Sequence, residues 1–314
     1  MSTKNIPQLD LSDFLSNDNN LRNKFVKSLG KAYADIGFVA VKNHGIPENT
    51  IDKLYQKLKA FFDLPLSVKQ KYELEENGGQ RGYTSFGKEH AKNSSVGDLK
   101  EFWHFGQEIN ENSRNEENYP QNIYVDEVPD FLDVGVEAYK SFEKTGFTIL
   151  RALALHLGLD ENYFNEFVKG GNSILRPIHY PPIENPQTNA VRAGEHEDIN
   201  LITLLVGASA DGLQVLNKNG EWISVTAVKD HIVVNVGDML QRLTNEKLKS
   251  TTHRVVNPDG DNISESRYSV PFFLHPISSM KLNCLEECID DKKIYEDITA
   301  GEYLHERLKE LGLM

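Results

Sequence analysis

Two histidines and one aspartate are the residues whose types and order suggest metal chemistry. His196 and Asp198 flank Glu197 in a His-Glu-Asp triplet, and His253 stands in the segment Ser-Thr-Thr-His-Arg-Val-Val. Imidazole nitrogens and carboxylate oxygens both bind divalent first-row metals. Because an isolated His-x-Asp pair is frequent in proteins that bind no metal, the prediction depends on the segments that surround these residues.

The surrounding segments are expected to be β-strands. The triplet runs into an apolar, β-branched stretch at 199–206. If one strand carries both, alternation directs His196 and Asp198 to one face and Glu197 to the other. Two histidines and one carboxylate on a shared face leave three coordination positions open, which is typical of mononuclear non-haem Fe(II) sites. A zinc hydrolase remains an alternative, since the same residue types bind zinc.

Arg267 and Ser269 form a candidate anion site further along the chain. They stand two positions apart in Arg-Tyr-Ser-Val-Pro-Phe-Phe, so on a strand both side chains leave the same face. The planar guanidinium matches a carboxylate, and a neighbouring hydroxyl adds a hydrogen bond. Because apolar Val270, Phe272 and Phe273 flank the pair, we expect the arginine to be buried, and a buried arginine requires an anion.

Composition is typical of a globular chain and disfavours polyanionic partners. The 314 residues carry a formal net charge of −13, so neither nucleic acid nor an anionic membrane is an expected partner. No apolar run reaches membrane-spanning length and the first residues lack an apolar signal region, which predicts a cytoplasmic protein. Cys284 and Cys288 lack neighbouring ligand residues and are expected to be reduced thiols.

Helices and strands earlier in the chain must support these residues, and hydrophobic periodicity locates several of them. The predicted helices cover 21–36, 48–62 and 139–157, and the predicted strands include 38–41 and 99–105. In the second strand, Phe102 and His104 alternate with Trp103 and Phe105. One pair is therefore expected to line a pocket while the other packs in the core.

Taken together, the motifs resemble the isopenicillin N synthase-like branch of the Fe(II)/2-oxoglutarate oxygenases. His-Glu-Asp-Ile-Asn-Leu-Ile-Thr at 196–203 resembles the first-ligand segment of that family, and His253-Arg-Val resembles its distal ligand segment. Asp-Gly-Leu-Gln-Val at 211–215 and Gly-Glu-Trp-Ile at 220–223 resemble its central hairpin, and the Arg-x-Ser motif resembles its acid-binding pair. The combination is specific, whereas each motif alone is not.

The resemblance implies an α+β fold with a distorted double-stranded β-helix, or jelly-roll, core flanked by helices. It also implies three regions along the chain. These are an N-terminal dioxygenase region at 1–120 that is integrated with the core, the jelly-roll core at 170–280 and a C-terminal helical segment at 281–314.

The resemblance further implies Fe(II), O₂ and 2-oxoglutarate as co-substrate. The implied iron ligands are His196, Asp198 and His253, and the implied 2-oxoglutarate contacts are Arg267, Ser269 and Tyr180, whose Tyr-Pro strand is similar to one in the family. An Arg-x-Gly-Tyr segment of the synthase binds the acid of its substrate. It has one residue more between Arg and Gly than the segment here. The candidate substrate-binding residues are Arg81, Tyr83, Phe102 and His104.

The predicted function is a non-haem Fe(II)- and 2-oxoglutarate-dependent dioxygenase that hydroxylates or desaturates a small organic substrate. One alternative is an isopenicillin N synthase-type Fe(II) oxidase that uses no 2-oxoglutarate, although the tail at 309–314 lacks the glutamine found in that synthase. A second alternative is a non-catalytic small-molecule-binding jelly-roll protein. Substrate identity and oligomeric state are left open, because pocket residues on loops cannot be placed from one sequence.

Overall fold

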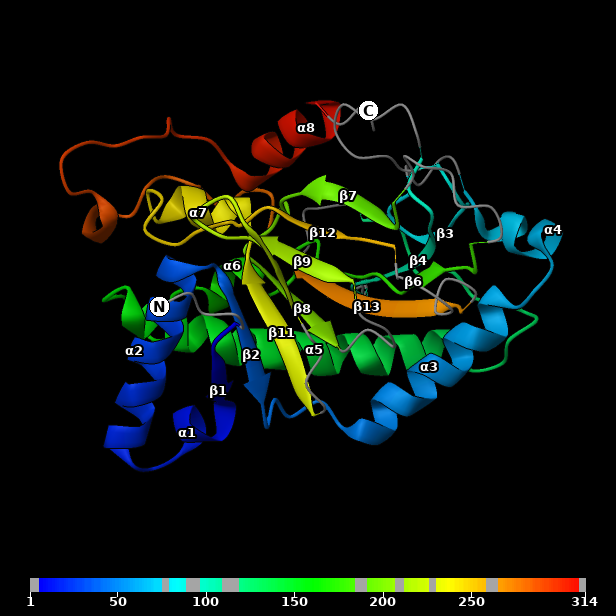
Figure 1. Cartoon of the computed structure of the whole chain (residues 1–314), viewed down its shortest axis with the longest axis horizontal. Helices are drawn as coiled ribbons and strands as arrows, with labels where there is room; N and C mark the ends of the chain where they lie inside the picture. The colour runs from blue at the N-terminus through cyan, green and yellow to red at the C-terminus, as the bar shows by residue number, and fades with distance from the viewer. Residues whose placement is uncertain are drawn as a thin grey trace.

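Two β-sheets and a set of flanking helices make up the protein (Figure 1). The computed structural model describes residues 6–74, 79–88, 97–108, 119–183, 191–206, 212–225, 230–257 and 265–310. Within this part of the chain, helices and strands mix along the sequence. The predicted α+β class is therefore confirmed.

The larger sheet contains nine strands, in the order β1-β2-β11-β8-β13-β5-β4-β3, with β6 pairing β13 and β4. Its strands are β1 (Gln8–Asp10), β2 (Phe38–Lys42), β3 (Gly82–Thr84), β4 (Glu101–Gly106), β5 (Ile174–Leu175), β6 (Ile178–Tyr180), β8 (Ile202–Val206), β11 (His231–Val236) and β13 (Arg267–Leu274). Strands β1 to β4 from the N-terminal region thus lie in the same sheet as strands from the C-terminal half.

The smaller sheet contains four strands in the order β10-β9-β12-β7. Its members are β7 (Ala193–His196), β9 (Leu213–Leu216), β10 (Trp222–Ser224) and β12 (His253–Val255). All its pairings are antiparallel. Together with β8, β11, β13 and β6 of the larger sheet, these strands form the two-sheeted core that a jelly roll requires.

Helices flank the two sheets (Figure 1). They are α1 (Leu11–Leu15), α2 (Asn19–Asp35), α3 (Glu48–Phe62), α4 (Leu66–Lys69), α5 (Phe131–His156), α6 (Asn165–Val168), α7 (Asp238–Leu243) and α8 (Ala300–Glu310), with 3-10 turns at Gln70–Tyr72 and Glu286–Cys288. The long helix α5 crosses behind β8 and β13 (Figure 1). On it, the Tyr139 ring lies 5.1 Å from the Phe272 ring of β13.

Strand alternation separates the two faces of β4, as the sequence predicts. Trp103 and Phe105 point outward into an aromatic cluster with Phe61 and Phe131, and their ring centroids lie 4.9–5.1 Å from these partners. Phe102 points the other way and packs with residues of β6. The outer face therefore anchors the sheet to α3 and α5, which leaves the inner face for the site.

Candidate iron and 2-oxoglutarate site

His196, Asp198 and His253 converge between the two sheets. His196 ends β7, and His253 begins β12 directly opposite it in the antiparallel register. The His196 and His253 Nε2 atoms lie 3.9 and 3.7 Å from Asp198 Oδ1. One ligand atom from each residue lies within 4.8 Å of the others. This spacing and donor set fit one Fe(II) ion that is bound by three protein atoms on one face of its coordination sphere.

The route by which Asp198 joins the histidines differs from the predicted single strand. The chain leaves β7 at His196, crosses from the smaller sheet to the larger one, and begins β8 only at Ile202. Asp198 lies in this crossing segment rather than on a strand. Glu197 still points elsewhere, because its carboxylate accepts a hydrogen bond of 3.1 Å from the Thr252 hydroxyl.

Backbone carbonyls set the orientation of both imidazoles. His196 Nδ1 lies 2.8 Å from the Gly194 carbonyl oxygen, and His253 Nδ1 lies 3.1 Å from that of Thr251. A carbonyl can only accept, so both Nδ1 atoms must carry the proton and donate it. Each Nε2 therefore keeps a lone pair directed at the metal position, as is usual where a histidine's other nitrogen is hydrogen-bonded in a metal site.

The two carboxylate oxygens of Asp198 have different partners. Oδ2 accepts hydrogen bonds from Thr203 Oγ1 at 2.6 Å and from Asn235 Nδ2 at 2.8 Å. Oδ1 faces the two histidines and is available for iron. Burial alone would raise the pKa of Asp198. The adjacent His253 and His196 and these two hydrogen bonds outweigh burial, so the pKa is below its usual value.

His196 is prepared to bind metal as a neutral ligand. Partial desolvation by the surrounding protein and the neighbouring His253 lower its pKa to about 4, against the opposing effect of Asp198. Its ring nevertheless remains accessible, with 42% of the side chain exposed. An imidazole that is unprotonated and accessible near neutral pH needs no proton release before it binds a cation.

Strand register shows that the predicted anion-binding residues face the same interior. Phe273 of β13 is paired with Thr203 of β8, whose hydroxyl contacts Asp198, so this face of β13 is directed at the metal position. Arg267 and Ser269 occupy alternate positions of the same strand and share that face. Arg267 is only 1% exposed.

Tyr180 joins this group from β6. It is paired with Arg267 in the antiparallel register, and the Arg267 Cζ atom lies 4.8 Å from the centre of the Tyr180 ring. A guanidinium, a hydroxyl and a tyrosine thus lie along the same interior face. Hydrogen-bond donors of these types match the oxygens of a carboxylate.

Two of the four candidate substrate residues, Phe102 and His104, also belong to the interior. Phe102 is paired with Ile178, which is itself paired with Ser269 of the anion-binding face. The Phe102 and His104 rings lie 5.0 Å apart. Their neighbour Arg176, whose Nε donates to His104 Nε2 at 2.5 Å, was not predicted as a site residue from the sequence. Its position just before Pro177, between two short strands, gave no signal of function.

Arg81 and Tyr83 lie away from this interior. Tyr83 is paired with Trp103 on the outer face, and its hydroxyl donates to Glu101. The Arg81 guanidinium occupies the space over Gly106, where an added Cβ would lie 1.8 Å from Cζ. Because Tyr83 contacts Glu101 and Arg81 packs over Gly106, neither side chain lies with Phe102 and His104.

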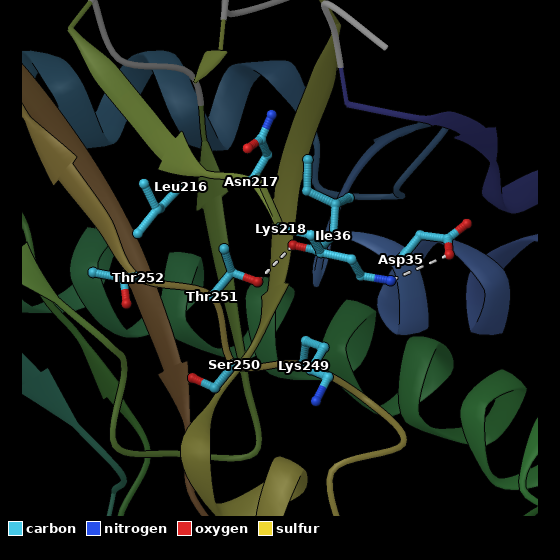
Figure 2. Close-up of a pocket in the computed structure, with 9 residues that line it drawn as sticks. All are labelled: Asp35, Ile36, Leu216, Asn217, Lys218, Lys249, Ser250, Thr251 and Thr252. Carbon is cyan, nitrogen blue, oxygen red and sulfur yellow. Dashed lines mark hydrogen bonds and ion pairs between the residues drawn. The ribbon is translucent and has the colours of Figure 1, made fainter. Parts of the chain in front are cut away.

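A surface recess of about 280 Å³ lies beside the β9–β10 hairpin and is lined by Asp35, Ile36, Leu216, Asn217, Lys218, Lys249, Ser250, Thr251 and Thr252 (Figure 2). Thr251 donates to the Ile36 carbonyl at 2.7 Å, and Lys218 lies 3.7 Å from Asp35 across it. The recess contains none of the three iron ligands, so it is separate from the site described above.

Family models match most of the chain. Residues 6–127 match the model described as the N-terminal region of a non-haem dioxygenase in morphine synthesis, and residues 171–276 match the 2OG-Fe(II) oxygenase superfamily model. Proline hydroxylase buaE of Petromyces alliaceus is 33% identical over 320 residues, covering 96% of this chain and 98% of the relative.

Solved structures agree over nearly the full length. A putative 2OG-Fe(II) oxygenase family protein from Caulobacter crescentus has a TM-score of 0.88 at 38% identity, covering 98% of this chain and 99% of its own. A full-length Neurospora crassa protein, solved in complex with α-ketoglutarate (2-oxoglutarate) and thymine, has a TM-score of 0.86 at 30% identity, covering 97% of this chain and 96% of its own.

The chain therefore belongs to the isopenicillin N synthase-like branch of the Fe(II)/2-oxoglutarate oxygenase superfamily. The predicted jelly-roll core and the predicted 2-oxoglutarate-dependent Fe(II) dioxygenase activity are confirmed, and the His-Asp-His triad supplies the iron site. Iron and 2-oxoglutarate, when bound, supply the oxygen chemistry, while the side chains bind, orient and exclude water. No described helix is long and apolar enough to cross a membrane.

Proposed function

We propose that Arg267, Ser269 and Tyr180 bind the distal carboxylate of 2-oxoglutarate while its oxo-acid end is directed at the iron ligands. The supporting observation is the shared face of β13, on which Arg267 and Ser269 alternate toward Phe273 and the metal position. A buried guanidinium requires an anion, and a carboxylate fits its planar donors. In the alternative without 2-oxoglutarate, the same pair would bind the carboxylate of the substrate itself.

Arg267→Leu tests this role. Loss of charge-assisted hydrogen bonds, each worth about 1.5–3 kcal/mol, should weaken 2-oxoglutarate binding at least tenfold. The measurement is an anaerobic titration of the charge-transfer absorbance of the Fe(II)–oxo-acid complex. Iron affinity should be unchanged and Ser269→Ala should have a smaller effect in the same direction. An absorbance band with unchanged affinity in Arg267→Leu would exclude the proposed role.

We propose further that the substrate is a small, planar ring compound, bound against the inward-facing Phe102 and Phe273 beside Arg176 and His104. The Arg176 Cζ atom lies 4.5 Å from the Phe102 ring centre and 5.2 Å from that of Phe273. Aromatic faces favour flat partners, and the Arg176 guanidinium provides polar contacts at the ring edge. The Neurospora crassa protein, solved with thymine or 5-formyluracil, is a structural neighbour with this kind of ligand.

The test is substrate-stimulated succinate formation with thymine, uracil and L-proline as probes. We expect a pyrimidine base to stimulate turnover and Phe273→Leu to raise its KM about 2- to 13-fold, because stacking contributes roughly 0.5–1.5 kcal/mol beyond area burial. Phe86→Leu, at an exposed phenylalanine, is the matched control. Turnover of L-proline alone, insensitive to Phe273→Leu, would contradict the planar-ring proposal and favour an amino-acid substrate.

We also propose the division into an N-terminal region at 1–120, a jelly-roll core at 170–280 and a C-terminal segment at 281–314. Strands β1 to β4 pair within the sheet of the core, which supports a single cooperative unit rather than separable domains. Limited proteolysis tests this division. An N-terminal fragment that folds alone would contradict the integration of the N-terminal region with the core.

A further inference from the structure

A second buried arginine approaches the same tyrosine as Arg267. Arg192 directly precedes β7, the strand that ends at the iron ligand His196. The Arg192 Cζ atom lies 5.8 Å from the Tyr180 ring centre, and that of Arg267 lies 4.8 Å from it. Both arginines are 1% exposed. The two guanidinium groups therefore converge on one buried ring, Arg267 from β13 and Arg192 from the residue before β7.

Among the described residues, two of the three guanidinium nitrogens of Arg192 have no hydrogen-bond partner. Its Nη2 donates to the Glu265 carbonyl oxygen at 3.1 Å, which fixes the end of the side chain beside the start of β13. Within the described part of the chain, its Nε and Nη1 atoms are buried without any hydrogen-bond partner. A guanidinium remains charged under all ordinary conditions, so a buried one with unused donors is costly unless an anion enters.

The electrostatic surroundings of Arg192 also favour the entry of an anion. Burial and the positive charge of Arg267 both lower the pKa of Arg192, against an opposing effect from Tyr180. The carbonyl of Glu265, rather than its carboxylate, contacts the guanidinium. Two neighbouring buried cations repel one another, and a carboxylate between them relieves the repulsion while satisfying the unused donors.

We propose that Arg192 and Arg267 together bind the distal carboxylate of 2-oxoglutarate, so that the site selects a dicarboxylic over a monocarboxylic oxo acid. The inference rests on the proposed role of Arg267 and adds a second contact from the other sheet. Because Arg192 and His196 belong to the same segment, the arginine also ties the position of the carboxylate to the strand that bears an iron ligand.

The experiment compares two oxo acids in the iron-loaded protein without oxygen. Binding of 2-oxoglutarate and of 2-oxopentanoate, which lacks the distal carboxylate, is titrated by charge-transfer absorbance in wild type, Arg192→Gln and Arg192→Lys. We expect Arg192→Gln to weaken 2-oxoglutarate binding at least tenfold and to leave 2-oxopentanoate binding within twofold of wild type. Arg192→Lys should recover part of the affinity, because it keeps the charge but not the planar donors.

Arg254→Gln is the matched control. Arg254 lies on β12 beside His253, but its Nε donates to Gln214 and its Nη1 lies 3.0 Å from the exposed Glu195. The control therefore removes a positive charge from the same sheet without touching the interior, and should not change either affinity. A double-mutant cycle with Arg267→Gln should be non-additive, because both arginines are expected to contact one carboxylate.

The outcomes separate this inference from the proposed function. Unchanged 2-oxoglutarate affinity in Arg192→Gln, with a weakened affinity in Arg267→Gln, would overturn the role of Arg192 alone. An equal loss of affinity for both oxo acids would also overturn the role of Arg192, because it would indicate a general distortion of the site and not the loss of a contact with the distal carboxylate. Absence of the absorbance band in wild type would overturn the co-substrate assignment together with this inference. Thermal melting of each variant without ligand establishes that it is folded.

Discussion

Asp198 uses its two carboxylate oxygens for different tasks. Oδ2 is held by Thr203 and Asn235, while Oδ1 is directed at the two histidines. Hydrogen bonds of this kind orient a metal ligand before the metal arrives, so less ordering is needed on binding. At the scale of single residues, iron affinity should therefore depend on these neutral side chains as well as on the ligands.

Thr203→Val should lower iron affinity about 10- to 100-fold, which is the usual effect of removing such a contact. The substitution keeps the shape of the side chain but removes the hydroxyl that donates to Asp198. Iron affinity is measured by competition with a chelator under anaerobic conditions. Thr148→Val, at a half-buried position of α5, is the control, since its hydroxyl donates to the Lys144 carbonyl within the same helix. Equal affinities for the two variants would show that the contact does not orient the ligand.

Asp198→Asn should abolish iron-dependent turnover, and Glu197→Gln should preserve most of it. The reason is their separate partners: Asp198 lies beside both histidines, whereas Glu197 accepts a bond from Thr252. Alanine at His196 or His253 should behave as Asp198→Asn does, since too few protein ligands remain. Iron content and turnover are the measurements. Comparable iron loss in the Glu197 and Asp198 variants would refute the ligand assignment.

At the scale of elements, a buried ionic cluster connects the strands that carry the anion-binding residues. Glu101 of β4 binds Lys69 of α4 at 2.8 Å and His179 of β6 at 2.7 Å. His179 in turn contacts the Ser266 hydroxyl at 3.0 Å and stacks on Tyr268 of β13. The cluster lies on the opposite face of β6 from Tyr180, so it supports the anion-binding face from behind.

Glu101→Gln should lower the free energy of unfolding by about 3–5 kcal/mol near pH 7, because Lys69 is left buried without its counter-charge. Burial opposes ionisation of Glu101, but hydrogen bonds from His179, Lys69 and Tyr83 lower its pKa in the folded protein below its ordinary value of 4.5. A lowered folded-state pKa stabilises the fold above about pH 4.5 and loses this effect as the pH falls further. Denaturant unfolding at several pH values should show the difference between wild type and variant shrinking on acidification. A difference independent of pH would exclude the ionised carboxylate as its cause.

At the scale of the whole molecule, helix α5 holds the larger sheet through close contacts at small residues. A Cβ added at Gly135 would lie 2.2 Å from the Phe105 ring, which is fixed between Trp103 and Phe131. A Cβ at Gly146 would lie 3.0 Å from the end of the Leu274 side chain, which can rotate. The neighbour of Gly135 is thus a fixed ring, whereas the neighbour of Gly146 is a side chain that can change its conformation.

Gly135→Ala should destabilise the protein by about 1–3 kcal/mol, although alanine is the better helix former by about 1 kcal/mol. Gly146→Ala should be neutral or stabilising, because the leucine can move and the helix propensity then decides the sign. Chemical denaturation of both variants measures the difference. Equal stability changes at the two positions would show that the aromatic cluster is not rigidly packed.

The sequence by itself determined the features that depend on local order. The helix predicted at 48–62 is α3 with the same bounds, since its apolar spacing and the proline before it are local signals. The prediction for α5 began eight residues late, at 139 instead of 131, because its first turns present small residues such as Gly135 to the sheet. The shared face of Arg267 and Ser269 was likewise predictable, because β13 is one continuous strand.

Only the tertiary structure decided which distant residues meet. Asp198 reaches the histidines through a crossing between two sheets, and strand alternation in a single segment could not reveal that crossing. Arg192 and Arg176 carry no local motif, yet the first converges with Arg267 on Tyr180 and the second lies over Phe102. Within a strand, successive side chains point to alternate faces, so their directions can be predicted from the sequence. Which residue each side chain meets across the interior depends on strand register and on the packing of the two sheets. These arise only when the whole chain is folded.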